Sequence, residues 1–327
     1  MLRKDKTKYN VIDLFCGAGG FARGFVEVGF NVVLAIDNME PVARTFKINF
    51  PETIVLCEDI KNINDRILKR LLLGKQVDVV IGSPPCEPFT AANPRRKPNP
   101  LDRLYVDPIG QLVLHFIRIV DYVRPKIFIM ENVPHIAEGE LKRALREEFK
   151  RIGYNRIYFN LLKAEDYGTP SHRLRMFISN IPIKPRKRRG KITVEEALSS
   201  LPPPTPEIPN HEPVPISPRK LRRISRLKWG QALVRFYGFM GKLYPNLIRL
   251  HPHKIAPTVL GCSRFIHPYE DRFLTVREQA RLMGFPDDHI FLGGRDLQYN
   301  QVGEAVPVPL SKAIAQVVLE KLEEEDY

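Results

Sequence analysis

A cysteine that follows two prolines is the residue of this sequence best placed to do chemistry. Cys86 lies in Gly82-Ser-Pro-Pro-Cys-Glu-Pro-Phe-Thr90, directly after the apolar, β-branched run 77–81. Each proline fixes its φ angle and removes a backbone donor, so the pair predicts a rigid, extended turn at the carboxyl end of a strand. Open α/β sheets carry their reactive groups at that edge. A thiol there could act as a nucleophile, and a small core cysteine is the alternative.

Further polar groups follow the ends of other apolar runs. The run 11–14 leads through three glycines into a helical pattern, and glycines at such a turn let a ligand approach the backbone closely. Asp37 ends the second run, where an acid can accept hydrogen bonds from a ribose diol. Asp59 follows the third run, where it could meet an adenine amino group. Each aspartate could instead cap a helix. Three such positions at successive strand ends favour a cofactor site, either for a dinucleotide or for S-adenosylmethionine.

An acid and a pair of arginines could complete this site. Glu131 follows the apolar run 127–130, which would bring its carboxyl group beside the Cys86 turn. A solvated loop acid is the alternative. Arg173 and Arg175 are two residues apart at the beginning of an expected strand, so their side chains project from the same face. Arginines on an open surface are the alternative, but their position before an apolar strand favours one shared site.

The elements that must position these groups follow from the spacing of apolar residues. Short apolar runs alternate with helical patterns through the first 180 residues, which predicts an α/β fold with a doubly wound, mostly parallel sheet. The expected strands are 10–14, 32–36, 53–57, 77–81, 126–130, 156–161 and 175–179. The expected helices are 20–28, 41–50, 62–72, 109–123, 139–152, 275–283 and a last one from residue 309 onward.

Composition excludes several classes of protein. The four cysteines include no CxxC pair, and no secretory signal is present, which argues against a disulfide framework or a metal site and favours a cytoplasmic location. No apolar run approaches about 20 residues, so we expect no membrane span. The net charge is +14, and residues 181–250 hold +11 of it, with fifteen Lys and Arg against four Asp and Glu. This concentration predicts a surface that binds a polyanion, with a solvated basic face as the alternative.

In combination these features resemble the cytosine-C5 DNA methyltransferases over nearly the whole chain. Asp13-Leu-Phe-Cys-Gly-Ala-Gly-Gly20 is similar to the family's cofactor loop, Pro84-Pro-Cys86 to its nucleophile motif and Glu131-Asn-Val133 to its catalytic acid. Arg173-Leu-Arg175 is similar to its paired arginines, and the runs 277–287 and 301–307 to its last two motifs. Six motifs in the usual order make the resemblance highly specific. The family keeps its target recognition domain between the arginines and residue 277, where the basic charge is concentrated.

The resemblance implies a covalent mechanism. The Cys86 thiolate attacks C6 of a cytosine, while Glu131 engages N3 and the exocyclic amine. Arg175 holds the base O2, and Arg173 helps to position the base or the Cys86 loop. The activated C5 then takes the methyl group of S-adenosylmethionine, and loss of the C5 proton releases Cys86. A cytosine inside a duplex cannot reach such a site, so the base must flip out. The stretch 87–106 resembles a mobile loop that closes over the flipped base.

The resemblance also implies residue sets for the two ligands and a division of the chain. We expect a catalytic and cofactor-binding domain at 1–180, a smaller target recognition domain at 181–272 and a C-terminal segment, 273–327, that returns to the catalytic domain. The expected partners are double-stranded DNA and, functionally, a cognate restriction endonuclease, with the chain acting as a monomer. The cofactor-binding residues would be Asp13, Phe15, Gly17, Ala18, Gly19, Gly20, Asp37, Asn38, Asp59, Ile60, Pro85, Leu112, Glu304 and Ala305. The DNA-binding residues would be Arg95, Arg96, Lys97, Arg186, Lys187, Arg188, Arg189, Arg222, Arg223 and Thr258.

Three positions depart from the family pattern. Glu87 and Ser171 each stand where the family usually has Gln, and Glu304 stands where it usually has Asn. Two other functions remain open. One is a tRNA cytosine-C5 methyltransferase, which some RNA enzymes with DNA-type motifs resemble, although 261–265 lacks the Cys-Phe-Thr element usual in them. The other is a catalytically silent DNA-binding module, against which the intact Cys86 and Glu131 argue.

Overall fold

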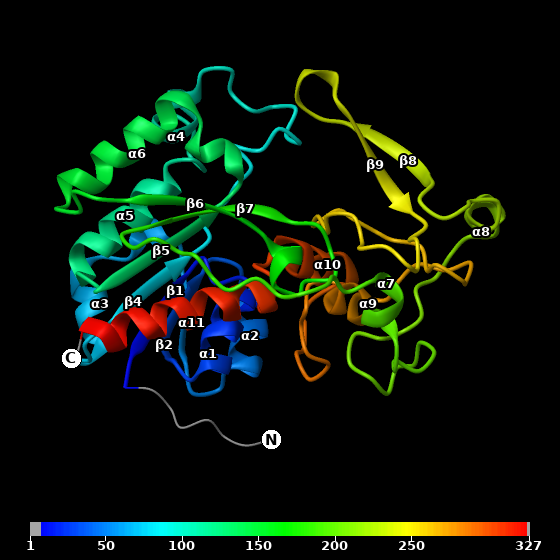
Figure 1. Cartoon of the computed structure of the whole chain (residues 1–327), viewed down its shortest axis with the longest axis horizontal. Coiled ribbons are helices and arrows are strands. Elements are labelled where there is room, and N and C mark those ends of the chain that lie inside the picture. The colour runs from blue at the N-terminus through cyan, green and yellow to red at the C-terminus, as the bar shows by residue number, and fades with distance from the viewer. Residues whose placement is uncertain (1–7, 326–327) are drawn as a thin grey trace.

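The computed structural model describes residues 8–325, which form a seven-stranded sheet covered by helices and a separate two-stranded sheet (Figure 1). The large sheet runs in the order β3-β2-β1-β4-β5-β7-β6, in which β1 to β5 are parallel while β7 is antiparallel to both of its neighbours. This confirms the predicted doubly wound, mostly parallel α/β fold. Its strands are β1 (Asn10–Leu14), β2 (Asn31–Asp37), β3 (Ile54–Cys57), β4 (Val79–Gly82), β5 (Ile127–Asn132), β6 (Tyr158–Lys163) and β7 (Leu174–Ser179).

The central strands are apolar along their whole length because both of their faces are buried. In β4, Val79 and Ile81 belong to one core cluster and Val80 to the other, as expected for side chains that alternate across a sheet. The first cluster packs under α1 (Gly20–Val28), α2 (Glu40–Asn49) and α11 (Val308–Glu325). The second packs under α3 (Asp65–Leu72), α4 (Pro100–Tyr105), α5 (Leu112–Val123) and α6 (Gly139–Arg151).

Residues 181–272 are mostly irregular, in agreement with the ten prolines between 181 and 218. They contain two short helices, α7 (Val194–Leu198) and α8 (Pro218–Ile224), and the antiparallel hairpin of β8 (Ala232–Tyr237) and β9 (Leu243–Ile248). A small core of Ile224, Ile266 and Phe273 lies under this part. The chain then returns through α9 (Val276–Arg281) and α10 (Arg295–Glu304) to α11 beside α1 (Figure 1).

The predicted helices and strands are present. Some begin or end a few residues away from the predicted positions, because local side-chain hydrogen bonds set their ends. Every expected strand of the large sheet occurs within two residues of its predicted ends. The helix expected at 62–72 begins at residue 65, because the Asn64 side chain accepts from the Ile67 N–H and caps it there. The helix expected at 109–123 begins at residue 112, because the Asp107 carboxylate accepts the Ile109 and Gly110 N–H groups in a turn. The sequence did not predict α4, α10 or the β8–β9 hairpin.

One stretch of the described chain is long and apolar enough to cross a membrane, contrary to the expectation from sequence. It spans residues 295–324, but 56% of its most apolar window is buried inside the protein. The apolar face of α11, with Leu310, Ile314 and Val318, packs into the same core cluster as α1. The apolar character of α11 is therefore explained by its place in the core.

The contact between α1 and α11 yields a test of the packing. Gly24 of α1 lies so close to α11 that a β-carbon there would overlap the backbone of Ser311 and Lys312. We expect Gly24→Ala to lower the free energy of unfolding by about 2 kcal/mol, because overpacking outweighs the higher helix propensity of alanine. Urea unfolding measures this change. Val26→Ala, at a half-exposed position of the same helix, is the control and should change stability by less than about 0.5 kcal/mol. A stabilised Gly24→Ala variant would contradict the close approach of the two helices.

Candidate active site

The antiparallel strand β7 brings Arg175 to the edge of the sheet where β4 and β5 end. The carboxyl ends of β4 and β5 meet there because the two strands are parallel, which places the Cys86 turn beside Glu131. Since β7 is antiparallel to β5, with Met176 opposite Asn132, its first residues lie at that same edge. Arg175 therefore comes to the acid from a strand that runs the other way.

Glu131 and Arg175 form a buried ion pair next to Cys86. The Arg175 Nε lies 2.9 Å from Glu131 Oε1, and the two side chains are only 13% and 7% exposed. Burial raises the pKa of the Cys86 thiol to about 11, Arg175 acts to lower it, and Glu131 and Glu87 raise it further. The Asn132 side chain donates to the Pro84 carbonyl across 3.0 Å and so holds the turn in place. The free protein therefore keeps a protonated thiol beside an arginine that favours its ionisation.

Arg173 is an electrostatic neighbour of Cys86 and Glu131, and its hydrogen bonds reach two distant segments. Its side chain is buried, and its guanidinium donates to the carbonyls of Val259 at 3.0 Å, Gly303 at 2.9 Å and Glu304 at 3.3 Å. The expectation that it holds the base or the Cys86 loop is thus not matched by its hydrogen bonds. Arg173 instead ties the recognition segment and the C-terminal segment to the beginning of β7.

The expected cofactor loop has the geometry to hold a nucleoside cofactor with a charged tail. Phe15, Gly17 and Gly19 have positive φ angles of 56°, 53° and 86°, so the loop turns sharply between β1 and α1. The Gly17 N–H donates to Asp37 across 3.0 Å, and no protein atom lies within 4 Å of a β-carbon built on Gly17. The α1 N-terminus has no side-chain cap and no acid in its first turn. The Ala22 N–H donates to the Asp13 carboxyl group, and the N–H groups before it suit the carboxylate of S-adenosylmethionine.

The other residues expected to bind the cofactor differ in how far they are buried. Asn38 is exposed, Pro85 and Leu112 are half-buried, and Ala305 lies against Gly20. Asp59 caps a turn by accepting from the Lys61 N–H, which was the alternative for this acid. Two further predicted residues, Asp13 and Ile60, are buried. Burial raises the pKa of Asp13 well above its usual range.

Glu304 lies between the cofactor loop and the Cys86 turn. The pKa of its carboxyl group is raised, because protein displaces water around it and because Glu87 and Asp37 add negative charge, while Arg173 acts in the opposite direction. Two of the three departures from the family pattern, Glu87 and Glu304, are therefore electrostatic neighbours. The third, Ser171, is buried and donates to the Leu282 carbonyl across 2.7 Å, so it serves the packing of the C-terminal segment.

The segment after Cys86 contacts the tip of the recognition hairpin. Figure 1 shows the cyan segment and the yellow tip approaching each other, and the Phe239 N–H donates to the Ala91 carbonyl across 2.9 Å. The Arg96 guanidinium stacks on the Phe239 ring at 4.5 Å. The carbonyls of Lys97 and Pro98 accept from the buried Arg103 side chain. The predicted mobile loop is thus joined to the hairpin near its middle and held by hydrogen bonds within itself, while Arg95 is exposed.

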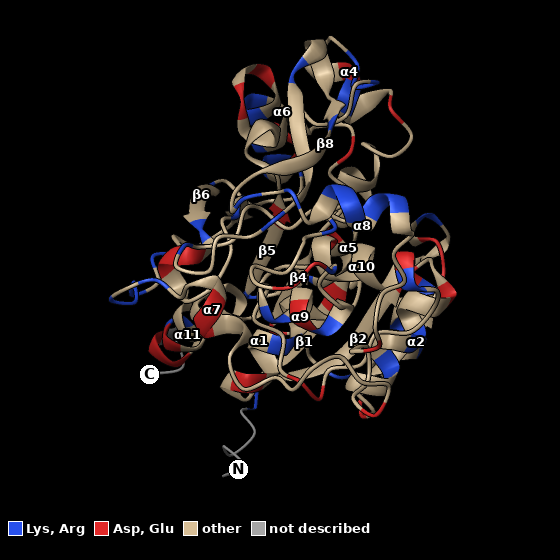
Figure 2. Cartoon of the chain, turned by 90° about the vertical axis from the view of Figure 1, so that its right-hand side faces the viewer, with Lys and Arg blue, Asp and Glu red and all other residues tan. Residues whose placement is uncertain are grey.

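The basic charge of residues 181–250 does not form one surface. The run that holds Arg186, Arg188 and Arg189 docks near Gly168 and α11, where Lys187 pairs with Asp166 at 2.9 Å and Lys191 pairs with the same acid. Arg222 and Arg223 lie on α8, at the far side of the recognition segment, and Figure 2 shows a band of Lys and Arg there. Thr258 is half-buried and precedes Val259, the partner of Arg173.

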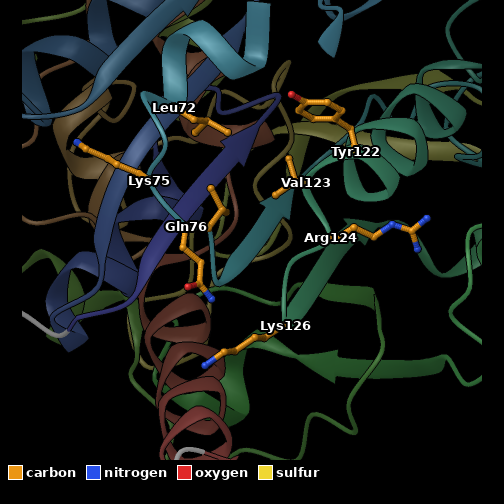
Figure 3. A pocket seen from close by; sticks show the side chains of 8 residues that line it. Leu72, Lys75, Gln76, Tyr122, Val123, Arg124 and Lys126 are labelled. Atoms are coloured by element: carbon orange, nitrogen blue, oxygen red, sulfur yellow. The ribbon is translucent and has the colours of Figure 1, made fainter. Parts of the chain in front are cut away.

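One cavity of the protein lies away from this site. A cavity of about 340 Å³ opens at the amino ends of β4 and β5, opposite the edge that carries Cys86, and Figure 3 shows Lys75, Arg124 and Lys126 among its lining residues. It is therefore separate from the catalytic groups. Among residues 8–325, no three His, Cys, Asp or Glu side chains gather as a metal site would require.

The sequence did not predict three residues that contact the cofactor loop or the Cys86 turn. Phe285 packs against Gly20, with its Cζ atom 3.1 Å from a β-carbon built there. Asn132 lies in the motif quoted for the catalytic acid, but its bond to Pro84 was not foreseen. His289 contacts the Ala18 carbonyl of the cofactor loop. All three depend on contacts between distant segments, for which a single sequence carries no signal.

Known proteins match this chain over nearly its full length. The profile of the C-5 cytosine-specific DNA methylase family matches residues 9–184 and 220–320. A type II methyltransferase of Methanocaldococcus jannaschii is 52% identical over 96% of this chain and 100% of its own length. Type II methyltransferase M1.HphI of Haemophilus parahaemolyticus is 36% identical over 94% of this chain and 86% of its own. A crystal structure of a DNA modification methyltransferase encoded in a prophage of E. coli superimposes with a TM-score of 0.79 at 26% identity, covering 97% of this chain and 100% of the other.

The family match, the relatives and the geometry at the sheet edge agree with one another. The chain belongs to the C-5 cytosine-specific DNA methylases, and it transfers a methyl group from S-adenosylmethionine to C5 of cytosine in DNA.

Proposed function

We propose that Cys86, Glu131 and Arg175 carry this reaction and that Arg173 positions them. The observation that supports the proposal most directly is the buried Glu131–Arg175 ion pair beside a thiol whose pKa is raised to about 11. C5 of cytosine is a weak nucleophile, so the ring must gain electrons before it can accept a methyl group. Cys86 supplies them by adding its sulfur to C6, and its thiol proton passes to solvent water as the bond forms.

Glu131 and Arg175 act on the opposite side of the flipped base. Glu131 engages N3 and the exocyclic amine as negative charge develops on the ring, and Arg175 donates to O2. Pairing in the resting enzyme keeps both charged groups compensated until a base separates them. The 17–20 loop and Asp37 would hold S-adenosylmethionine, which would supply the methyl group and leave as S-adenosylhomocysteine. When solvent water takes the C5 proton, the C5–H electrons form the C5=C6 double bond. The electrons of the C6–S bond leave with the sulfur, which releases Cys86 as a thiolate.

The proposed duplex surface combines the hairpin tip, the 87–99 segment and the basic residues of 181–250. The contact between Phe239 and Ala91 supports the placement of both segments over the same edge of the sheet. Arg95, Arg96 and Lys97 would contact phosphates beside the flipped base, and α8 would follow the backbone further along. The hairpin and these basic residues belong to 181–272, which is the proposed target recognition domain.

The cellular role belongs to the same proposal. The relatives are named type II methyltransferases, which supports a function beside a cognate restriction endonuclease. The four cysteines are free thiols, which suits the reducing cytoplasm. We propose that the enzyme acts there as a monomer. An endonuclease gene next to this one, and a single species of about 38 kDa by light scattering, would support these assignments.

The covalent step is tested by removing the thiol. Cys86→Ala should abolish methyl transfer in a tritiated-methyl assay while duplex affinity and cofactor affinity stay close to those of the wild type. On DNA with 5-fluorocytosine at the target, the wild type should form an adduct that survives denaturation, because no C5 proton can leave. Cys262→Ala removes an exposed thiol as the control and should keep full activity. Normal turnover by Cys86→Ala would rule out the mechanism.

The raised pKa of Cys86 predicts how its alkylation depends on pH. The thiolate is the reactive form, so a pKa of about 11 leaves about one thousandth of the thiol ionised at pH 8. Brief pulses of iodoacetamide, read by peptide mass spectrometry, should show a rate that still rises between pH 9 and 11. Arg175→Met should move this profile to higher pH and Glu131→Gln to lower pH, since Arg175 lowers and Glu131 raises the pKa. Exposed Cys57 and Cys262 serve as references in the same digest. A plateau near pH 8.5 would contradict the burial of the thiol.

The duplex surface is tested by the dependence of DNA affinity on salt. Replacing residues 186–189 by alanine should flatten the slope of log affinity against log salt by about 0.9 for each phosphate that the variant no longer neutralises. Arg222→Ala with Arg223→Ala tests α8 separately, and the slope left after both changes should reflect the contacts of the 87–99 segment. Lys69→Ala with Arg70→Ala, on α3, is the charge-matched control for the α8 pair. Slopes unchanged in both recognition variants would make these runs solvated faces. Methyl transfer to tRNA alone in a parallel assay would establish the RNA alternative.

A further inference from the structure

His289 is a buried histidine whose hydrogen bond reaches the cofactor loop from the C-terminal segment. Its Nε2 lies 2.8 Å from the Ala18 carbonyl, and its side chain is fully buried. A carbonyl oxygen can only accept, so the ring proton must be on Nε2. The other ring nitrogen, Nδ1, has no partner among the described residues. The imidazole is therefore neutral and in one defined tautomer.

The surroundings of the ring keep it in that form. Phe285, Phe291 and Phe50 surround it, with ring centroids 4.7, 5.1 and 6.1 Å away. Burial lowers the pKa of His289 to about 3, and nearby Arg23 and Arg277 act in the same direction, against the Ala18 bond. The histidine consequently donates the same hydrogen bond throughout the pH range in which the enzyme works.

The backbone that carries His289 is fixed on both sides. The fully buried Arg277 of α9 donates to the His289 carbonyl at 2.6 Å and to the Pro286 carbonyl at 3.0 Å. Asn49 of α2 exchanges two hydrogen bonds with the backbone of Ile290, at 2.7 and 2.9 Å. The ring is thus held at a defined place relative to α2, which follows directly after Asp37 and Asn38.

The bond acts on one peptide group of the cofactor loop. The Ala18 carbonyl and the Gly19 N–H belong to the same peptide plane, which joins Ala18 to a glycine whose φ is 86°. His289 holds the carbonyl, and the Cys16 carbonyl accepts the Gly19 N–H at 2.9 Å. Gly19 is the residue before α1, so this peptide belongs to the backbone that leads from the loop into the helix. Without the bond to His289, only the N–H side of this peptide would be held, and the adjoining glycine permits it to tilt.

We propose that His289 is a positioning residue for S-adenosylmethionine, which orients the Ala18–Gly19 peptide so that the loop is preformed for the cofactor. This inference rests on the proposed assignment of the 17–20 loop to cofactor binding. Preorganisation of this kind raises affinity by removing an ordering cost from the binding step. His289 therefore contributes to cofactor affinity without touching the cofactor.

Three variants separate positioning from packing. His289→Phe keeps a ring and removes the donor, and it should weaken S-adenosylmethionine binding about tenfold by calorimetry. His289→Gln can place an amide N–H near the former Nε2 and should restore affinity to within about threefold of the wild type. Phe291→Leu disturbs the same aromatic cluster without removing the bond, so it should lower the melting temperature and leave cofactor affinity unchanged. The KM for the cofactor should rise in His289→Phe, while kcat at saturating cofactor and duplex affinity stay within about twofold.

These experiments also separate the role of His289 from the assignment of the 17–20 loop to cofactor binding. Equal cofactor affinity in His289→Phe and the wild type would overturn the positioning role, as would equally weakened binding in His289→Phe, His289→Gln and Phe291→Leu. Asp37→Ala tests the site itself, because its carboxylate accepts the Gly17 N–H. If Asp37→Ala also bound the cofactor normally, the assignment of the loop would fail, rather than the role of His289 alone.

Discussion

Arg173 carries a positive charge into the interior, where burial lowers the pKa of its guanidinium to about 9. A charge without water around it is stable only if protein groups replace the lost hydration. Here the carbonyls of Val259, Gly303 and Glu304 do so, and they come from the end of the recognition segment and from the end of α10. The buried arginine therefore requires both segments to return to the beginning of β7. The cofactor side, the catalytic side and the recognition side of the site meet around this one group.

The position of Arg173 also explains the division of labour within the arginine pair. Arg175 lies two residues further along, at the start of β7, where it pairs with Glu131. Arg173 thus holds the recognition segment and α10 against the sheet, whereas Arg175 lies beside the proposed catalytic residues. Because β7 runs against β5, the pair enters the sheet at the edge where the parallel strands end. A fully parallel sheet would have placed the beginning of that strand at the opposite edge, far from Cys86.

The sequence predicted what depends on local pattern. The strands of the large sheet were found because burial on both faces makes them continuous apolar runs, as at Val79–Gly82. Cys86, Glu131 and the glycine loop were found because polar groups after such runs must lie at the sheet edge. The β8–β9 hairpin was missed because Val234, Tyr237 and Leu243 are exposed and leave no alternating apolar pattern.

Long-range partners account for the other differences. The carbonyls that Arg173 binds lie 86 and 130 residues further along the chain, and His289 is 271 residues from Ala18. The basic run at 186–189 was expected to be wholly available to DNA, but Asp166, on a distant turn, neutralises part of it. Backbone carbonyls and single surface acids carry no signature in a sequence. Only the fold shows which of them a charged side chain meets.

The position of the methyl group in the product shows whether a cysteine adds to the base. Duplex DNA incubated with the enzyme and S-adenosylmethionine bearing an isotopically labelled methyl group can be digested to nucleosides and analysed by mass spectrometry. A thiol that adds to C6 activates only C5, so the account predicts label in 5-methyl-2′-deoxycytidine alone. Label in N4-methylcytosine or N6-methyladenine would contradict it, because exocyclic amines are methylated without a cysteine nucleophile.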